Sequence, residues 1–168
     1  MSQSSNLIVQ ISYVLLDGRT LVGQVSKIRD AEDAVPELWQ EGDWGELADV
    51  ISEEDVLAFA QVSRDVQWIH TDRERAKAAH GGLVVHGALT SSLVSALYGN
   101  VMPGPGAIYL ESHVSFKKMV IAGQRITARA TIASYAPNGI MRLDTRVTNE
   151  ADVVVAEGNS VLLVRRPK

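Results

Sequence analysis

Apolar positions near the start of the chain fall into two short runs, at residues 7–16 and 19–25. Both runs are rich in β-branched residues, and the pair Asp17-Gly18 stands between them. The tightest hairpin turns need a positive φ at both central residues, which Asp and Gly tolerate well. The pattern therefore predicts a β-hairpin at the start of the chain.

The stretch that follows, residues 31–46, is polar and is interrupted by proline and glycine. This composition predicts a loop or a short helix. We therefore divide the chain into an N-terminal extension, residues 1–45, and a main domain, residues 46–168.

Helical spacing dominates the middle of the chain. Ser52 is followed by three acidic residues, so a hydroxyl stands at the N-cap of a first helix and carboxylates lie in its first turn. A second helix is predicted to begin near Asp72. A third covers residues 87–98 and ends at Gly99-Asn100, a common helix stop. Small residues surround its apolar stripe, which predicts that other parts of the chain enclose this helix.

The last third of the chain alternates in the manner of strands. The strand candidates are residues 108–116, 125–135, 140–148 and 153–164. The alternation is clearest in the second candidate, whose apolar side carries Ile126, Ala128, Ala130 and Ile132. Asn138-Gly139 predicts a hairpin turn. Together these elements predict an α+β fold, in which an antiparallel meander follows a buried helix.

The composition is that of an ordinary globular protein, with 46% hydrophobic and 21% charged residues in a chain of 168. A formal net charge of −4 argues against nucleic acid or an anionic membrane as the main partner. The chain has no cysteine, which excludes disulfides, thiolate catalysis and zinc–sulfur sites. No apolar stretch reaches the ~18 residues of a membrane span, and residues 1–6 lack the basic flank of a signal peptide. We expect a cytoplasmic protein.

Asp65 and His70 are the first candidates for chemistry. Five helical steps would place them roughly 140° apart around one axis, so they cannot share a helix face. If they act together, the chain must leave helical geometry after the first helix. An Asp–His pair that meets in such a loop can move protons near neutral pH.

Gly87 is the candidate for binding a negatively charged oxygen. Addition of water to a conjugated thioester needs a base, an acid and a donor to the thioester carbonyl. At the start of a helix, Gly87 offers an N–H without an intrahelical partner, a favourable dipole and no side chain. Asp65, His70 and Gly87 together fit the needs of a hydratase.

The sequence of residues 63–70, Ser-Arg-Asp-Val-Gln-Trp-Ile-His, precedes Val85-His86-Gly87. This pattern resembles the MaoC-like family of (R)-specific enoyl-CoA hydratases and related dehydratases. That family carries a Ser-Gly-Asp-x-Asn-Pro-hydrophobic-His signature, followed about 17 residues later by His-Gly and a buried helix. The resemblance spans roughly residues 51–164 and leaves the N-terminal extension outside.

The resemblance implies roles for individual residues. It places Asp65 and His70 on the catalytic positions and Gly87 on the oxyanion-binding glycine. Ser95 falls on a serine that lines the acyl pocket in some members. Gln67 stands where the family has asparagine, and we assign it to substrate binding.

The resemblance also implies a hotdog fold, in which an antiparallel sheet wraps one long helix. It implies a homodimer with active sites at or near the subunit interface, and a substrate linked to CoA or to an acyl-carrier protein. No metal is implied, and no cofactor apart from the CoA or phosphopantetheine that belongs to the substrate.

The chain departs from the family pattern at several positions. Arg64 replaces the usual glycine, which costs about 1 kcal/mol if the residue is left-handed. Gln67-Trp68 replaces Asn-Pro beside the proposed site. Met119 and Gln124 replace a frequent proline and a frequent aspartate in the segment after the central helix.

For several other residues, a structural role is the simpler interpretation. His86 is read as a structural residue that bonds backbone at a helix start, and His80 and His113 as surface or core residues. A metal trio of His70, His80 and His86 matches no zinc spacing. Lys117 and Lys118 could contact phosphates, but solvated charge is the commoner role. Trp68 fits a pocket wall as well as the core.

These residues predict a hydro-lyase that interconverts trans-2-enoyl and (R)-3-hydroxyacyl thioesters. Within this class, a polyketide-pathway dehydratase on a carrier protein is one variant. A hotdog acyl thioesterase and a non-catalytic acyl-binding subunit of a biosynthetic complex stay open as alternatives. Release of free thiol would indicate the first alternative, and acyl-CoA binding without turnover the second.

Overall fold

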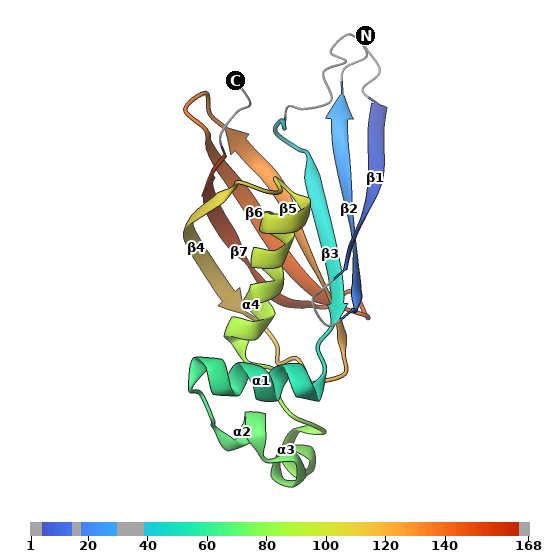
Figure 1. Cartoon of the computed structure of the whole chain (residues 1–168), viewed down its shortest axis with the longest axis vertical. Coiled ribbons are helices and arrows are strands. Elements are labelled where there is room, and N and C mark those ends of the chain that lie inside the picture. The colour runs from blue at the N-terminus through green and yellow to red at the C-terminus, as the bar shows by residue number, and fades with distance from the viewer. Residues whose placement is uncertain (1–4, 15–17, 30–38, 165–168) are drawn as a thin grey trace.

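The structure is a computed structural model, and it describes residues 5–14, 18–29 and 39–164 (Figure 1). Its strands form one antiparallel sheet in the order β1-β2-β3-β5-β6-β7-β4. The strands are β1 Ser5–Val14, β2 Thr20–Arg29, β3 Trp44–Val50, β4 Ile108–Phe116, β5 Arg125–Tyr135, β6 Ile140–Asn149 and β7 Val154–Leu163.

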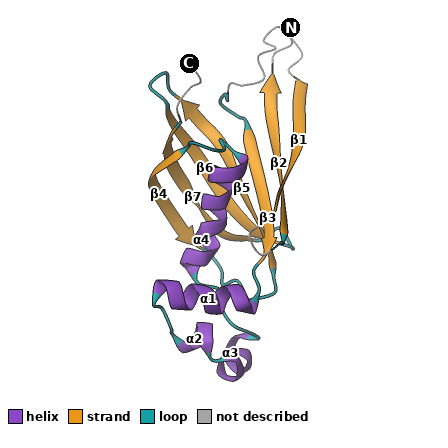
Figure 2. Cartoon of the chain, viewed as in Figure 1, coloured by secondary structure: helices purple, strands orange, loops and turns teal. Residues whose placement is uncertain are grey.

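The helices divide into two groups (Figure 2). One helix, α4, runs along the face of the sheet and continues as a π-helical segment, while the other three gather at one end. The helices are α1 Glu53–Ser63, α2 Trp68–Thr71, α3 Arg73–His80 and α4 Gly87–Ala96, and the π-helical segment is Leu97–Val101. The expected α+β hotdog architecture, a sheet around a central helix, is confirmed.

The core lies between α4 and the sheet. Ile126, Ala128, Ala130 and Ile132, the predicted inner face of β5, are all buried. The bounds of β5 are those predicted; β6 extends one residue beyond the predicted end, and β7 is one residue shorter than predicted at each end. The buried side chains that α4 and its π-helical continuation contribute to the same core are Leu93, Val94, Leu97, Tyr98 and Val101.

The predicted N-terminal hairpin is confirmed. β1 and β2 pair from Ser5↔Arg29 to Val14↔Thr20, and β2 pairs in turn with β3. Asp17 of the predicted turn lies outside the described residues, and Gly18 has a φ of 84°. The hairpin therefore adds two strands to one edge of the sheet.

The stretch 31–46 is predicted as a loop or short helix, and for its last residues this prediction is wrong. Residues 30–38 lie outside the described part, while Trp44 begins β3. Gly45 is one of the buried positions of β3, where a Cβ would lie 2.8 Å from the Cβ of Met102. The glycine leaves room for Met102, and it also removes the apolar side chain that would have revealed the strand.

The other edge of the sheet is β4, every residue of which is exposed in the single chain. Its exposed apolar side chains are Ile108, Tyr109, Leu110, Val114 and Phe116. An edge strand of this kind offers unpaired backbone groups together with apolar surface. No helix in the described part of the chain is both long and apolar enough to cross a membrane.

Candidate active site

The predicted bend after α1 is present. The helix ends at Ser63, and Arg64 follows in the left-handed region with φ 68° and ψ 9°. The Ser63 hydroxyl donates to the carbonyl of Phe59 at 2.7 Å and accepts from the amide of Asp65 at 3.2 Å. The Asp65 carboxylate accepts from the amide of Gln67 at 3.3 Å, which closes a turn. The chain therefore leaves the helix axis within two residues.

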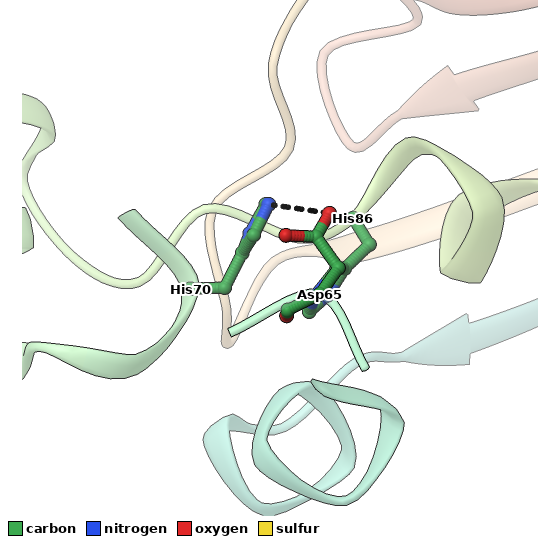
Figure 3. A group of neighbouring side chains, drawn as sticks. All are labelled: Asp65, His70 and His86. Carbon is green, nitrogen blue, oxygen red and sulfur yellow. Dashed lines mark hydrogen bonds and ion pairs between the residues drawn. The ribbon is translucent and has the colours of Figure 1, made fainter. Parts of the chain in front are cut away.

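His70 faces Asp65 from the short helix α2 (Figure 3). Its Nδ1 lies 2.6 Å from the carbonyl oxygen of Val84, which can only accept, so Nδ1 carries a proton. Its Nε2 lies 3.9 Å from Oδ2 of Asp65. The His70 side chain is buried, whereas 53% of the Asp65 side chain is exposed. The imidazole is thus fixed, and its basic nitrogen points at a carboxylate that solvent can reach.

The separation between these two groups suits a third atom. At 3.9 Å, Nε2 and Oδ2 are too far apart for a direct hydrogen bond. An oxygen atom placed beside both can lie at about 2.8 Å from each, within ordinary hydrogen-bond range. The pair can therefore hold and activate a water molecule or a substrate hydroxyl.

Gly87 begins α4 at the same place. It lines a cavity of about 420 Å³ together with His70 and Thr90. A Cβ on Gly87 would lie 2.9 Å from the ring of Phe116, so any larger residue here would require this ring to shift. The remaining lining residues are Ile69, Val84, Val85, Lys117, Lys118, Met119 and Val120.

Residues 42–155 match the family described as MaoC like domain. The chain belongs to the MaoC-like family. The matched segment begins before β3 and leaves out β1 and β2, so the hairpin precedes the family's domain.

Characterised relatives of this MaoC-like chain include hydratases and dehydratases. It is 32% identical over 126 residues to an (R)-specific enoyl-CoA hydratase of Rhodospirillum rubrum, covering 74% of this chain and 88% of the relative. It is 31% identical over 119 residues to a 3-hydroxybutyryl-CoA dehydratase of Methylorubrum extorquens, covering 70% and 74% of the two chains. The solved (R)-hydratase of Aeromonas caviae superimposes with a TM-score of 0.72 at 31% identity, covering 78% of this chain and 100% of that one.

Two residues that the MaoC-like pattern suggested lie away from the cavity of the single chain. Ser95 is exposed on α4, two turns beyond Gly87, and does not line the cavity. Gln67 is exposed at the N-cap of α2, and its backbone N–H donates to the carboxylate of Asp65. Their roles in substrate binding stay predictions.

Three contributors to the site carry no signal in the sequence. The Val84 carbonyl orients His70, Thr90 lines the cavity one turn into α4, and Phe116 covers Gly87 from the end of β4. Each comes from a different segment of the chain. Only the fold of the MaoC-like domain brings them together.

The expectation of no metal stays a prediction. Ligand atoms of Asp65, His70 and His86 lie within 4.8 Å of one another, whereas His80 stacks on Trp68 outside this group. The rings of His70 and His86 are stacked at 3.6 Å with an interplanar angle of 18°. Nitrogen lone pairs of stacked rings run side by side, so they do not converge on one ion.

Proposed function

We propose that the protein is a hydro-lyase that interconverts trans-2-enoyl thioesters and (R)-3-hydroxyacyl thioesters. One observation carries the proposal: a buried imidazole and a solvent-accessible carboxylate face each other at 3.9 Å beside the first residue of α4. The names of the relatives from Rhodospirillum rubrum and Aeromonas caviae support the same chemistry.

In the hydration direction, Asp65 and His70 hold a water molecule between Oδ2 and Nε2. One of them takes a proton from this water as its oxygen bonds to C3 of the enoyl group, and C2 receives a proton from the pair. Negative charge develops on the thioester oxygen during the step. The N–H of Gly87 and the dipole of α4 stabilise this charge. Dehydration uses the same groups in the opposite sense.

The substrate is linked to CoA or to an acyl-carrier protein, and the phosphopantetheine belongs to the substrate. The proposed mechanism uses no other cofactor, because Asp65 and His70 carry out both proton transfers. Lys118 lines the cavity and suits phosphate contact, while Lys117 is engaged with Glu157 at 3.0 Å. The cytoplasmic location expected from the sequence stays a prediction.

A homodimer completes the proposal. The exposed edge strand β4 ends at Phe116, which also lines the cavity, so a second copy on this edge would lie beside the active site. A partner there would cover apolar surface and supply the missing side of the acyl pocket.

The absorbance of the enoyl thioester gives a direct assay, and Asp65→Asn and His70→Ala are the decisive variants. We expect each to lower kcat by roughly 10²- to 10⁴-fold, because each removes one proton-transfer group. Asp144→Asn, which alters an exposed carboxylate on β6, should keep normal turnover. Near-normal kcat in both site variants would refute the assignment.

The same assay separates the alternatives. Release of free thiol without loss of the double bond would identify a thioesterase. Acyl-CoA binding without turnover would identify a binding subunit. Parallel assays with CoA-linked and carrier-protein-linked enoyl groups would identify the carrier, and a preference for the second would favour a biosynthetic dehydratase.

A further inference from the structure

His86 lies at the junction of the three elements that form the site. It is the N-cap residue of α4, and only 3% of it is exposed. Its ring stacks on His70 of α2 at a centroid distance of 3.6 Å (Figure 3). It also meets the ring of Phe59 of α1 edge-on at 5.1 Å. The imidazole is therefore held by neighbours on two sides, and its own backbone leads directly into Gly87.

The proton position on this ring follows from its contacts. Nε2 lies 3.0 Å from the carbonyl oxygen of Asp65, which only accepts, so Nε2 carries the proton and donates it. Nδ1 is buried and has no hydrogen-bond partner among the residues that the structure describes. A proton on Nδ1 would be a buried donor without an acceptor, so the ring keeps a bare Nδ1.

Asp65 is held through its main chain rather than through its carboxylate. Its amide donates to Ser63 and its carbonyl accepts from His86, so both backbone groups of the residue are engaged. Within the described part of the chain, the carboxylate accepts one hydrogen bond, at 3.3 Å from the backbone N–H of Gln67, and it faces Nε2 of His70. The hydrogen bond from His86 thus fixes the backbone position of Asp65 and leaves its carboxylate oxygens free of that bond.

We propose that His86 is a positioning residue for the reaction. Its Nε2–H anchors the turn that carries Asp65, and its ring sets the plane of His70, so that Oδ2 and Nε2 stand at the spacing one oxygen atom can bridge. This inference rests on the proposed function, and it assigns His86 no contact with substrate.

A purely space-filling role would not explain a histidine here. Phenylalanine offers a ring for the same stack and would leave no buried nitrogen without a partner. An unsatisfied buried acceptor costs stability, so the donor bond to Asp65 is the feature that phenylalanine lacks. His86→Phe is therefore expected to lower activity without lowering stability.

The test compares His86→Phe with His86→Gln, whose side-chain amide keeps a donor near the position of Nε2. We expect His86→Phe to lower kcat roughly 10- to 100-fold through misplacement of Asp65, with KM nearly unchanged and the thermal midpoint not reduced. His86→Gln should recover most of kcat. His80→Phe is the matched control, because the ring of His80 stacks on Trp68 rather than on His70.

Two results would overturn the inference. One is His86→Phe with wild-type kcat; the other is a fall of kcat and thermal midpoint together that His86→Gln does not relieve. A wild-type protein that turns over no enoyl thioester would instead refute the proposed function. In that case, nitrogen NMR of the wild-type protein tests the position of the proton on the His86 ring. A proton on Nε2 supports the hydrogen bond to Asp65, and a proton on Nδ1 alone excludes it.

Discussion

Gly87 meets two separate demands at one position. In the proposed mechanism its N–H, at the start of α4, is the donor to the substrate, and its missing side chain lets the ring of Phe116 approach. The first demand belongs to the chemistry, and the second belongs to packing. Arg64 shows a related cost, because it adopts the left-handed conformation that glycine would adopt with about 1 kcal/mol less strain.

A double-mutant cycle separates the two demands on Gly87. Gly87→Ala places a Cβ 2.9 Å from Phe116, so we expect the ring to move and kcat to fall by roughly 10-fold or more. Phe116→Ala removes the clash, and the double variant should then recover part of the loss in kcat. Kinetics of the four proteins measure this coupling. Strict additivity would mean that the ring contact does not limit Gly87.

At the scale of elements, α1 joins the hairpin to the site. Ser52 and Asp55 form a capping box at its start, and Arg19 binds the Asp55 carboxylate through two hydrogen bonds of 3.0 and 3.1 Å. The other end of α1 leads into Arg64 and Asp65. The helix therefore leads into the turn that holds Asp65 at one end and is tied to the N-terminal hairpin at the other.

The cap makes a stability contribution that depends on pH. Burial alone would raise the pKa of Asp55, but hydrogen bonds from Ser52 and Arg19 outweigh it, so the pKa is lowered from 3.8. A carboxyl whose pKa is lower in the folded state stabilises the fold above its unfolded pKa, and this is lost as pH falls through the folded value. We expect Asp55→Asn to lower the free energy of unfolding by about 1 kcal/mol at pH 7.

Denaturant unfolding at several pH values checks this expectation. The difference between wild type and Asp55→Asn should shrink as the pH falls below 3.8. Glu54→Gln changes a neighbouring first-turn carboxylate without these contacts and serves as the control. A difference that stays constant down to pH 2 would show that the ionised form of Asp55 contributes nothing.

Local signals decided which elements could be predicted. The start of α1 and the bounds of β5 were predictable because capping residues and alternation mark them within a few positions. β3 was not, because the space at Gly45 is filled by Met102, far along the chain. At the site, the Asp65–His70 pair was predictable, whereas the contacts of His86 with α1, with α2 and with the turn between them depend on packing between elements.

At the scale of the whole molecule, the two edges of the sheet differ in character. One ends in the added strand β1, and the other ends in β4, which exposes five large apolar side chains in the single chain. Of the strand residues that the structure describes, Phe116 on the β4 edge lines the cavity. This asymmetry favours β4 as the contact in the proposed homodimer.

A lysine introduced on each edge strand tests which edge of the sheet forms the dimer interface. We expect Leu110→Lys on β4 to convert the dimer to monomer, because a buried ammonium would face apolar side chains in the interface. Ile8→Lys on β1, where 60% of the side chain is exposed, should leave the dimer intact. Sedimentation of both variants gives the answer. A monomeric Ile8→Lys beside a dimeric Leu110→Lys would move the interface to the hairpin.

The fit between β2 and the end of the central helix limits how far the protein can be shortened. Leu21 and Val25 are core residues, and a Cβ on Gly23 would lie 2.8 Å from the side chain of Val101. A truncated chain of residues 42–155 would lack β2 and expose the apolar surface that β2 covers. It would also lose most of β7. A truncated protein designed from the family match alone would therefore lack part of the hydrophobic core, and we expect it to aggregate.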